Sequence, residues 1–472
     1  MKKIIKFLIV IMLLASFVTM LAACGGTQNG DGSKDDGTTD VTPGDDTQND
    51  DDTDEDNDGN DNDDEGENTT PEYTYSPVEG GTAYELINVI TDEKVITIPA
   101  LYNDKPVVGI GTEVFRNTQI EEVNLPDTLT YLGERAFSLC ISLKKVNLTE
   151  NSTLQKIGYK AFYQCEYLHT ITLPQTLEEV GASAFEGCID LVNLTIPDSV
   201  KVIGANAFDC GWYRSLTEKG VIYVGKVAYS YIQGDEQTAT ITLKSDTISV
   251  AEKAFYRNDI ITSVTIPQNV AYIGDLAFNG MSKLQNIIVS AQNAKYSSEG
   301  NGLIEVATDK LLVGTYLTEI PAYIATLGKE CFAYADNASF TTIFIPDSVT
   351  SIEEGAFRGI NSLVTIDIPM GVTCLTDNLF FECGALESIK IKMSVAEISN
   401  TCFARCTSLK TVTIDSDDVL KLCVLKVDAG HLLEWATTVY VIEGIDAISP
   451  YLVAYFDVVT SDKAGYTEWN IQ

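Results

Sequence analysis

Phenylalanine recurs through most of this chain at nearly constant spacing. Eleven of the seventeen phenylalanines fall on one lattice, in which most neighbours are 22 to 25 residues apart. The lattice residues are Phe115, Phe137, Phe162, Phe185, Phe208, Phe255, Phe278, Phe332, Phe357, Phe380 and Phe403. Two longer gaps, 47 residues before Phe255 and 54 before Phe332, each span about two periods with additional residues. Such a period predicts a solenoid of stacked coils, a fold that usually serves as a binding surface.

Each period carries the same order of residue types. The clearest copy, residues 184–204, reads AFEGCIDLVNLTIPDSVKVIG. Alternating Leu194 and Ile196 predict a short strand with its apolar side inward, and Pro197 ends that strand because it has no N–H for the ladder. Gly204 is expected to serve a turn before the next phenylalanine. One such coil has too little core to fold alone, so stacked coils must share one.

This pattern resembles the BspA-like leucine-rich repeats, a class of about 23 residues per repeat that is common on bacterial surfaces. The resemblance covers about residues 95–415. It implies an α/β repeat solenoid: a right-handed coil with one short parallel strand per repeat, and turns and short helical segments on the opposite side. It also implies a role in binding, since members of that family include adhesins for host extracellular proteins.

The two long gaps contain strand-like runs. Residues 221–231 hold two runs around Gly225-Lys226, and a glycine in first place suits a type II′ hairpin turn; residues 302–313 hold a second pair. We therefore predict two hairpin insertions, which in solenoids often form the binding surface. The alternative is that both are wide coils of purely structural use. The candidate ligand-binding residues are Tyr223, Tyr229, Tyr231, Glu305 and Lys310.

The ends of a solenoid must be covered, and the lattice has atypical stretches on both sides. Residues 73–114 are predicted to form an N-terminal cap and first coil, followed by the leucine-rich-repeat solenoid over residues 115–415. Residues 416–472 break the repeat and are predicted to form a C-terminal cap. A binding module at this end is the alternative.

The N-terminus has the features of an export signal. Three lysines precede the apolar run 7–20, which is too short for a permanent membrane helix of about 20 residues. The following Leu-Ala-Ala-Cys, ending at Cys24, resembles the lipobox of bacterial lipoproteins. That resemblance implies a signal peptide over residues 1–23 and a lipid on Cys24 that anchors the protein to the membrane at the bacterial cell surface. An ordinary secretory signal with a chance cysteine is the alternative, and both predict export.

An acidic, weakly apolar stretch follows the signal. Residues 25–72 contain nineteen Asp or Glu against one Lys. Such a segment buries too little to offset its ordering entropy, so residues 24–72 are predicted to be a disordered linker that lifts the domain off the membrane. Residues 73–472 carry 49 acidic and 27 basic side chains. This acidic balance argues against nucleic acid as a partner.

One motif in the linker matches a calcium-binding loop. Asp54, Asp56, Asp58 and Glu65 stand at the spacing D-x-D-x-D-G-x5-E, whose oxygens suit a seven-coordinate calcium ion. Asp61 stands where such loops carry an apolar residue. The motif therefore predicts either an acidic linker that binds calcium weakly or a structured calcium site. No other cofactor is expected.

Most cysteines recur with the period of the repeat, which predicts a structural role for them. Ten remain after Cys24, and six of these keep to the lattice: Cys140, Cys165, Cys188, Cys210, Cys383 and Cys406. In the resembled repeats this place holds small buried side chains that satisfy backbone groups at the turn. Neighbouring coils would bring cysteines within disulfide range, but parallel inward side chains favour inert buried thiols. Zinc is disfavoured, since no C-x-x-C pair occurs.

The sequence offers little for catalysis. Its only histidines are His169 and His431, and no phosphate loop or H-E-x-x-H motif is present. We therefore predict a non-enzymatic surface protein that acts in adhesion or scaffolding, with a protein or glycan ligand on a host or neighbouring cell. A glycan-binding protein with aromatic residues around the hairpins is one alternative. A structural spacer without a specific ligand is the other.

Overall fold

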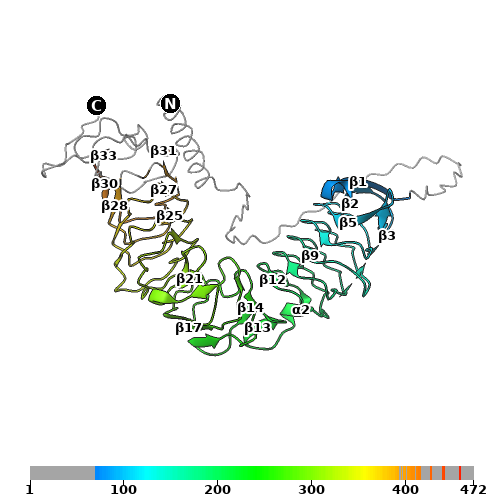
Figure 1. Ribbon diagram of the computed structural model, residues 1–472, viewed down its shortest axis with the longest axis horizontal. Helices are drawn as coiled ribbons and strands as arrows, with labels where there is room; N and C mark the ends of the chain where they lie inside the picture. The colour runs from blue at the N-terminus through cyan, green and yellow to red at the C-terminus, as the bar shows by residue number, and fades with distance from the viewer. Residues whose placement is uncertain are drawn as a thin grey trace, which may run out of the picture. The chain divides into compact units, whose positions relative to one another are not determined.

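The computed structural model describes residues 70–392, 395, 397–399, 401–409, 411–415, 426–427, 438–441 and 457–458. Over these residues the chain forms a parallel-strand solenoid of about 13 turns with almost no helix. Figure 1 shows the coils following one another in chain order, from β5 and β9 through β12 and β17 to β25 and β28. The predicted signal peptide, Cys24, the calcium motif and His431 lie outside the described residues.

Regular coils contain two short strands. In the coil before Phe185 these are the first strand, β10 (Thr170–Ile171), and the second strand, β11 (Glu179–Val180). β10 pairs in parallel with β8, whereas β11 pairs in parallel with β9 and β12. The prediction of one strand per repeat was therefore wrong. The second strand, which ends in a buried apolar residue such as Ile157 or Val180, makes its own ladder because the backbones of neighbouring coils approach closely there.

The first strands form three ladders. They are β3 (Val95–Thr97), β6 (Glu122–Asn124), β8 (Lys145–Asn147) and β10; β15 (Ala239–Thr242), β17 (Ile261–Ile266) and β19 (Asn286–Val289); and β24 (Thr342–Ile343), β26 (Thr365–Asp367), β28 (Ser388–Lys392), β30 (Thr411–Asp415), β32 (Thr438–Val441) and β33 (Asp457–Val458). β32 and β33 continue the last ladder in parallel within the predicted C-terminal cap.

The second strands belong to four ladders, the first of which starts with the antiparallel pair β1 and β2. They are β1 (Glu72–Val78), β2 (Ala83–Ile90), β4 (Leu101–Tyr102), β5 (Lys105–Ile110), β7 (Tyr131–Leu132), β9 (Lys156–Ile157), β11 and β12 (Val202–Ile203); β13 (Gly220–Val224), β14 (Val227–Ile232), β16 (Ser249–Val250) and β18 (Tyr272–Ile273); β20 (Tyr296–Ser297), β21 (Leu303–Glu305), β22 (Lys310–Val313), β23 (Thr326–Leu327) and β25 (Ser351–Ile352); and β27 (Cys374–Leu375), β29 (Glu397–Ile398) and β31 (Lys426–Val427).

Glycine follows the second strand of the regular coils because the backbone of the preceding coil leaves no room there for a side chain. A Cβ on Gly204 would lie 2.2 Å from the backbone nitrogen of Ala182, and one on Gly158 would lie 2.8 Å from the carbonyl carbon of Gly133. Neither glycine has a positive φ. Gly204 also begins a turn, as expected, because its carbonyl oxygen accepts a 3.3 Å hydrogen bond from the N–H of Ala207, but the close approach between coils is what requires glycine here.

The segment around each lattice phenylalanine, here called the phenylalanine turn, is not helical. Lys160 and Gln164 flank Phe162 with φ of 52° and 55°. Left-handed residues four apart interrupt a right-handed helix. The α/β prediction was therefore wrong, and the helices of the described residues are the 3-10 turns η1 (Glu79–Gly81) and η2 (Glu299–Asn301) and the single α-helical turn α2 (Gly211–Arg214).

Backbone hydrogen bonds compensate for this left-handed geometry. The N–H groups of Lys160, Phe162 and Gln164 donate to the carbonyls of Ala182, Ala184 and Glu186 in the next coil, at 2.8 to 2.9 Å. The phenylalanine turns thus form a third ladder. In each regular turn, the two left-handed residues and the phenylalanine donate backbone hydrogen bonds to the following coil.

The lattice phenylalanines form a column in the core, as predicted. The rings of Phe137 and Phe162 lie 5.2 Å apart with an angle of 4° between their planes. From Phe115 to Phe208 the centroid distances are 4.9 to 5.8 Å, and stacking resumes from Phe255 to Phe278 and from Phe332 to Phe403. All eleven rings are buried.

Antiparallel strands occupy both long gaps. β13 pairs with β14, and β21 pairs with β22. However, β14 also pairs in parallel with β16, and β22 with β23. The second strand of each pair is therefore itself a rung of a second-strand ladder, so each pair is built into a widened coil. No helix in the described part of the chain is long and apolar enough to span a membrane.

Candidate functional site

Five of the six lattice cysteines donate a hydrogen bond to the backbone of the preceding coil. Cys188 donates its S–H to the carbonyl oxygen of Phe162, with 3.1 Å between sulfur and oxygen. The same bond joins Cys140, Cys165, Cys383 and Cys406 to the carbonyl oxygen of the lattice phenylalanine one coil earlier, at 2.8 to 3.1 Å. The described cysteines are free of disulfides. Burial raises the pKa of Cys406 to about 12, so this thiol stays protonated and inert.

The side chains considered for catalysis or metal binding do not gather into a site among the described residues. His169 is exposed, and its Nδ1 lies 2.9 Å from the hydroxyl of its neighbour Thr170. No cluster of three His, Cys, Asp or Glu side chains suited to a metal ion occurs in the described ranges. The remaining candidate residues lie on the two hairpins, β13–β14 and β21–β22.

Tyr229 in the first hairpin belongs to the core. It is 5% exposed, and its hydroxyl accepts a hydrogen bond of 3.0 Å from the backbone N–H of Phe208. Its ring packs edge-on against Phe208, with 5.7 Å between centroids. The prediction that Tyr229 contacts a ligand was therefore wrong, because this ring continues the aromatic column at the place where the lattice is interrupted.

The other two tyrosines of the first hairpin are held by the chain itself. The hydroxyl of Tyr223 accepts a 2.9 Å bond from the backbone N–H of Lys244, whose Nζ lies 4.1 Å from the ring centroid. Tyr231 donates a 2.8 Å bond to Oε1 of Glu236. Burial, followed by this bond, raises the pKa of Tyr231 to about 12. The three tyrosines do not form the exposed coplanar set that a glycan platform requires.

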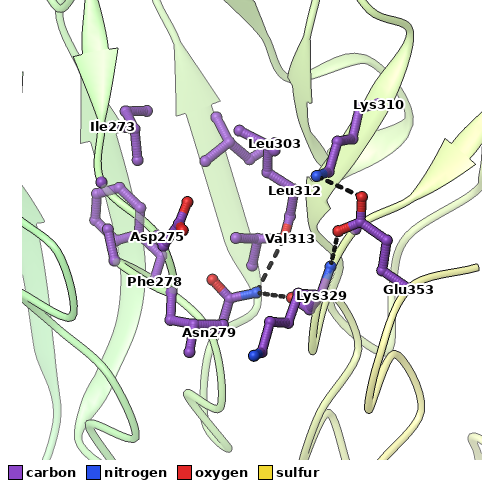
Figure 2. Close-up of a pocket in the computed structure, with 14 residues that line it drawn as sticks. Ile273, Asp275, Phe278, Asn279, Leu303, Lys310, Leu312, Val313, Lys329 and Glu353 are labelled. Carbon is purple, nitrogen blue, oxygen red and sulfur yellow. Dashed lines mark hydrogen bonds and ion pairs between the residues drawn. The ribbon is translucent and has the colours of Figure 1, made fainter. Parts of the chain in front are cut away.

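Lys310 in the second hairpin lies at a pocket of about 150 Å³ (Figure 2). Its Nζ lies 2.7 Å from Oε1 of Glu353, and Oε2 of Glu353 accepts a 2.9 Å bond from the backbone N–H of Lys329. Glu305, directly opposite Lys310 in the hairpin, accepts a hydrogen bond from Thr308. The two predicted residues are thus neighbours, but both are engaged within the chain.

This pocket lies at a seam between two hydrophobic clusters. Phe278 belongs to the first cluster, whereas Phe332 belongs to the second. Within the described residues, the backbone N–H of Phe278 makes no bond to the next coil. The buried side chain of Asn279 joins the coils instead, since its Nδ2 lies 3.0 to 3.2 Å from the carbonyl oxygens of Leu312, Lys329 and Glu330. Paired charges and a bridging amide make the pocket a structural joint.

A surface feature near the seam was missed at the sequence level. Phe344, on the strand side beside β24, is 81% exposed. The equivalent position of other first strands carries a polar residue, such as Thr172, Thr265 or Asp367. Ile288 of β19, which is 51% exposed, is the other large apolar exception. The signal was available, because Phe344 does not fall on the lattice.

The repeats place the chain among known proteins. The sequence matches the BspA type leucine rich repeat region, in six copies, over residues 96–213, 216–300 and 319–422, which is more than half of the chain. The chain belongs to this BspA-type family. No curated protein sequence matches it.

Several solved structures resemble this BspA-type chain. A leucine rich cell surface protein from Faecalibacterium prausnitzii is 25% identical, with coverage of 73% of this chain and 93% of that one and a TM-score of 0.36. A leucine-rich repeat protein from Eubacterium ventriosum is 19% identical, with coverage of 81% and 95% and a TM-score of 0.37. The pneumococcal vaccine antigen PcpA is 17% identical, with coverage of 82% and 95% and a TM-score of 0.38.

Proposed function

We propose that this BspA-type protein is a lipid-anchored bacterial surface protein whose solenoid binds a protein ligand in adhesion or scaffolding. Leucine-rich repeats are typically binding modules, and the Leu-Ala-Ala-Cys sequence supports the anchor at Cys24. The single observation that carries the binding site is Phe344, which is 81% exposed among polar positions of the first-strand ladder.

Exposure of this ring is costly unless a partner covers it. Full burial of a phenylalanine side chain is worth about 1.5–3 kcal/mol relative to exposure. Interface hot spots are enriched in large rings surrounded by near-neutral polar contacts that exclude water. Thr342 and Thr365 are exposed polar residues of the same ladder, and β24 and β26 pair them directly. We therefore assign Phe344 as the anchor and the neighbouring threonines as the rim.

The test measures binding of the full chain to purified extracellular matrix proteins and cell-wall glycans by biolayer interferometry. Phe344→Ala is expected to weaken binding of the protein ligand at least tenfold, about 1.4 kcal/mol. Thr265→Ala, at the equivalent position of β17, is the matched control and should leave the affinity unchanged. Binding only to glycans, or equal affinity of the wild-type protein and Phe344→Ala, would contradict the proposal.

The anchor needs a separate test. Cells that express the protein are labelled with radioactive palmitate, and label is expected on the wild-type chain but not on Cys24→Ala. The variant should also be released from membranes. Equal labelling of both chains would refute anchoring through Cys24. The calcium motif at Asp54, Asp56, Asp58 and Glu65 remains a prediction, which calcium titration of the full chain would test.

A further inference from the structure

Three arginines and two aromatic rings form a continuous row along the phenylalanine turns. The guanidinium carbon of Arg257 lies 4.6 Å from the ring centroid of Tyr334. That of Arg358 lies 6.0 Å from Tyr334 and 4.7 Å from Phe381, and that of Arg405 lies 5.2 Å from Phe381. We call these five residues the arginine–aromatic stripe. Such contacts are attractive because the face of an aromatic ring is electronegative.

Two glycines make room for the stripe. Gly280 and Gly359 each stand two residues after a lattice phenylalanine, with φ of 71° and 70°. A Cβ on Gly280 would lie 2.9 Å from Cγ of Arg257, and one on Gly359 would lie 2.4 Å from Cε1 of Tyr334. Arg257 and Tyr334 therefore extend across the glycine of the following coil, which brings their side chains within reach of the next members of the stripe.

Arg358 differs from the other two arginines of the stripe. Arg257 donates a 2.6 Å bond to the hydroxyl of Tyr334, and Arg405 lies 2.7 Å from Oε1 of Glu382. Arg358 makes no ion pair with any carboxylate of the described residues, and its Nε is buried without a hydrogen-bond partner. A guanidinium partly removed from water and lacking a counter-charge is costly. An anion beside the guanidinium would supply the missing counter-charge.

Another arginine in a similar place has the carboxylate partners that Arg358 lacks among the described residues. The guanidinium carbon of Arg135 lies 5.2 Å from the ring centroid of Tyr159, also at the phenylalanine turns. Arg135, however, pairs with Glu134 and lies 3.7 Å from Glu113. Arg135 therefore combines its contact with an aromatic ring and pairing of its charge with carboxylates. Arg358 contacts aromatic rings but has no carboxylate partner among the described residues.

We propose that Arg358 binds carboxylate groups of an acidic segment in the protein ligand, an inference that rests on the proposed binding function. A neutral glycan fits less well, since Tyr334 and Phe381 each already have two guanidinium groups within 6.0 Å of the ring centroid. Residues 73–472 are acidic overall, with 49 acidic and 27 basic side chains. An acidic segment is therefore held by direct contact with the stripe and repelled elsewhere, which gives the contact specificity.

The experiment measures fluorescence anisotropy of a labelled deca-glutamate peptide with the full chain at low salt. Arg358→Ala is expected to weaken binding about tenfold, because a charge-assisted pair is lost. Arg358→Lys keeps the charge but lacks the planar fork, so it should recover only part of the affinity. Arg135→Ala is the matched control and should bind within about twofold of the wild-type protein, since its charge is already paired. Thermal unfolding of each variant confirms that it folds.

Three outcomes would overturn the assignment. They are failure of the wild-type chain to bind deca-glutamate, equal losses for Arg358→Ala and Arg135→Ala, and Arg358-dependent binding of heparin without binding of the peptide. Phe344→Ala should bind deca-glutamate normally. If deca-glutamate binding depends on Arg358 while the protein ligand binds Phe344→Ala unchanged, the proposed role of Phe344 fails and the assignment of Arg358 stands.

Discussion

The coils from Phe115 to Phe208 and the seam between Phe278 and Phe332 are joined in different ways. In the regular coils, backbone groups of two strands and a phenylalanine turn hydrogen-bond to the next coil, and the rings stack at 4.9 to 5.8 Å. At the seam the hydrophobic core divides into two clusters, and the side chain of Asn279 replaces backbone bonds. The hydrogen bonds of the regular ladders are made by backbone groups, whereas the seam depends on the side-chain amide of Asn279.

The difference also concerns the surface. In the regular coils, the outward first-strand positions are polar and Arg135 is paired. Around and beyond the seam, Phe344 is exposed and Arg358 has no carboxylate partner among the described residues. Both candidate contact residues thus lie on the C-terminal side of the seam. The proposed function therefore assigns the regular coils mainly a scaffold role, and the following predictions test how the two regions differ.

The largest expected effect is on the aromatic column. Phe162→Ala should lower the free energy of unfolding by about 3–5 kcal/mol, since the ring is buried between two stacked neighbours. Phe278→Ala should cost less, because Phe278 stacks only on Phe255 and already borders the seam pocket. Urea denaturation of both variants provides the measurement. An equal or larger loss for Phe278→Ala would show that the seam is packed as tightly as the regular coils.

A smaller loss of unfolding free energy is expected where the backbones of neighbouring coils approach each other closely. Gly158→Ala places a methyl group 2.8 Å from backbone atoms of Gly133 and Leu132 and should cost about 1–3 kcal/mol in unfolding free energy. Gly384→Ala is the control, because its nearest neighbour is the side-chain oxygen of Asn361 at 3.3 Å. Thermal and urea unfolding compare the two. If Gly158→Ala and Gly384→Ala are equally stable, the backbones of the regular coils can move apart at little cost, and close approach does not require glycine there.

The seam should respond differently from the regular coils. Asn279→Ala removes the amide that serves three carbonyl oxygens and should cost about 1–3 kcal/mol. Because the cores on either side are separate, unfolding should also divide into two transitions. Asn293→Ala, which removes bonds to Pro267 and Val270 on one side of the seam, should keep a single transition. A single transition for Asn279→Ala would argue against a weak joint.

The smallest effect concerns an exposed ion pair of the regular coils. Hydrogen bonds from Lys144 and Lys94 lower the pKa of Glu121 to about 2 from 4.5. The folded state therefore gains stability from this carboxylate above about pH 4.5, and the gain is lost as pH falls toward 2. Thermal unfolding of Glu121→Gln should show a slightly flatter decline over that range than the wild-type protein, with Glu150→Gln as control. If the wild-type protein, Glu121→Gln and Glu150→Gln lose thermal stability equally as the pH falls, Glu121 makes no such contribution.

Periodicity predicted most of the scaffold. The phenylalanine column, the buried cysteines and the parallel first strands follow from residues that recur with the coil. The second strands and the near absence of helix in the described residues were missed, because they depend on contacts between coils. Lys160 and Gln164 have no sequence signature of left-handed geometry, and only the bonds to Ala182 and Glu186 select it.

The candidate contacts were predicted less well. Tyrosines in the first long gap suggested a surface, yet Tyr229 completes the core and Tyr223 and Tyr231 bond within the chain. Phe344 and Phe381 departed from the lattice, which was a usable signal. That Arg358 lies between Tyr334 and Phe381 was not predictable, because it depends on side chains from three coils and on the space above Gly359.

By itself, the sequence determined that this chain is a BspA-type solenoid, because a repeated apolar pattern can be buried only by stacking. The tertiary structure alone decided how the coils are joined and which side chains remain available. Hydrogen bonds between coils, the divided core at Asn279 and the unpaired charge of Arg358 arise between residues that are distant in sequence. A repeat specifies what is common to all coils, whereas a binding site is made where neighbouring coils differ.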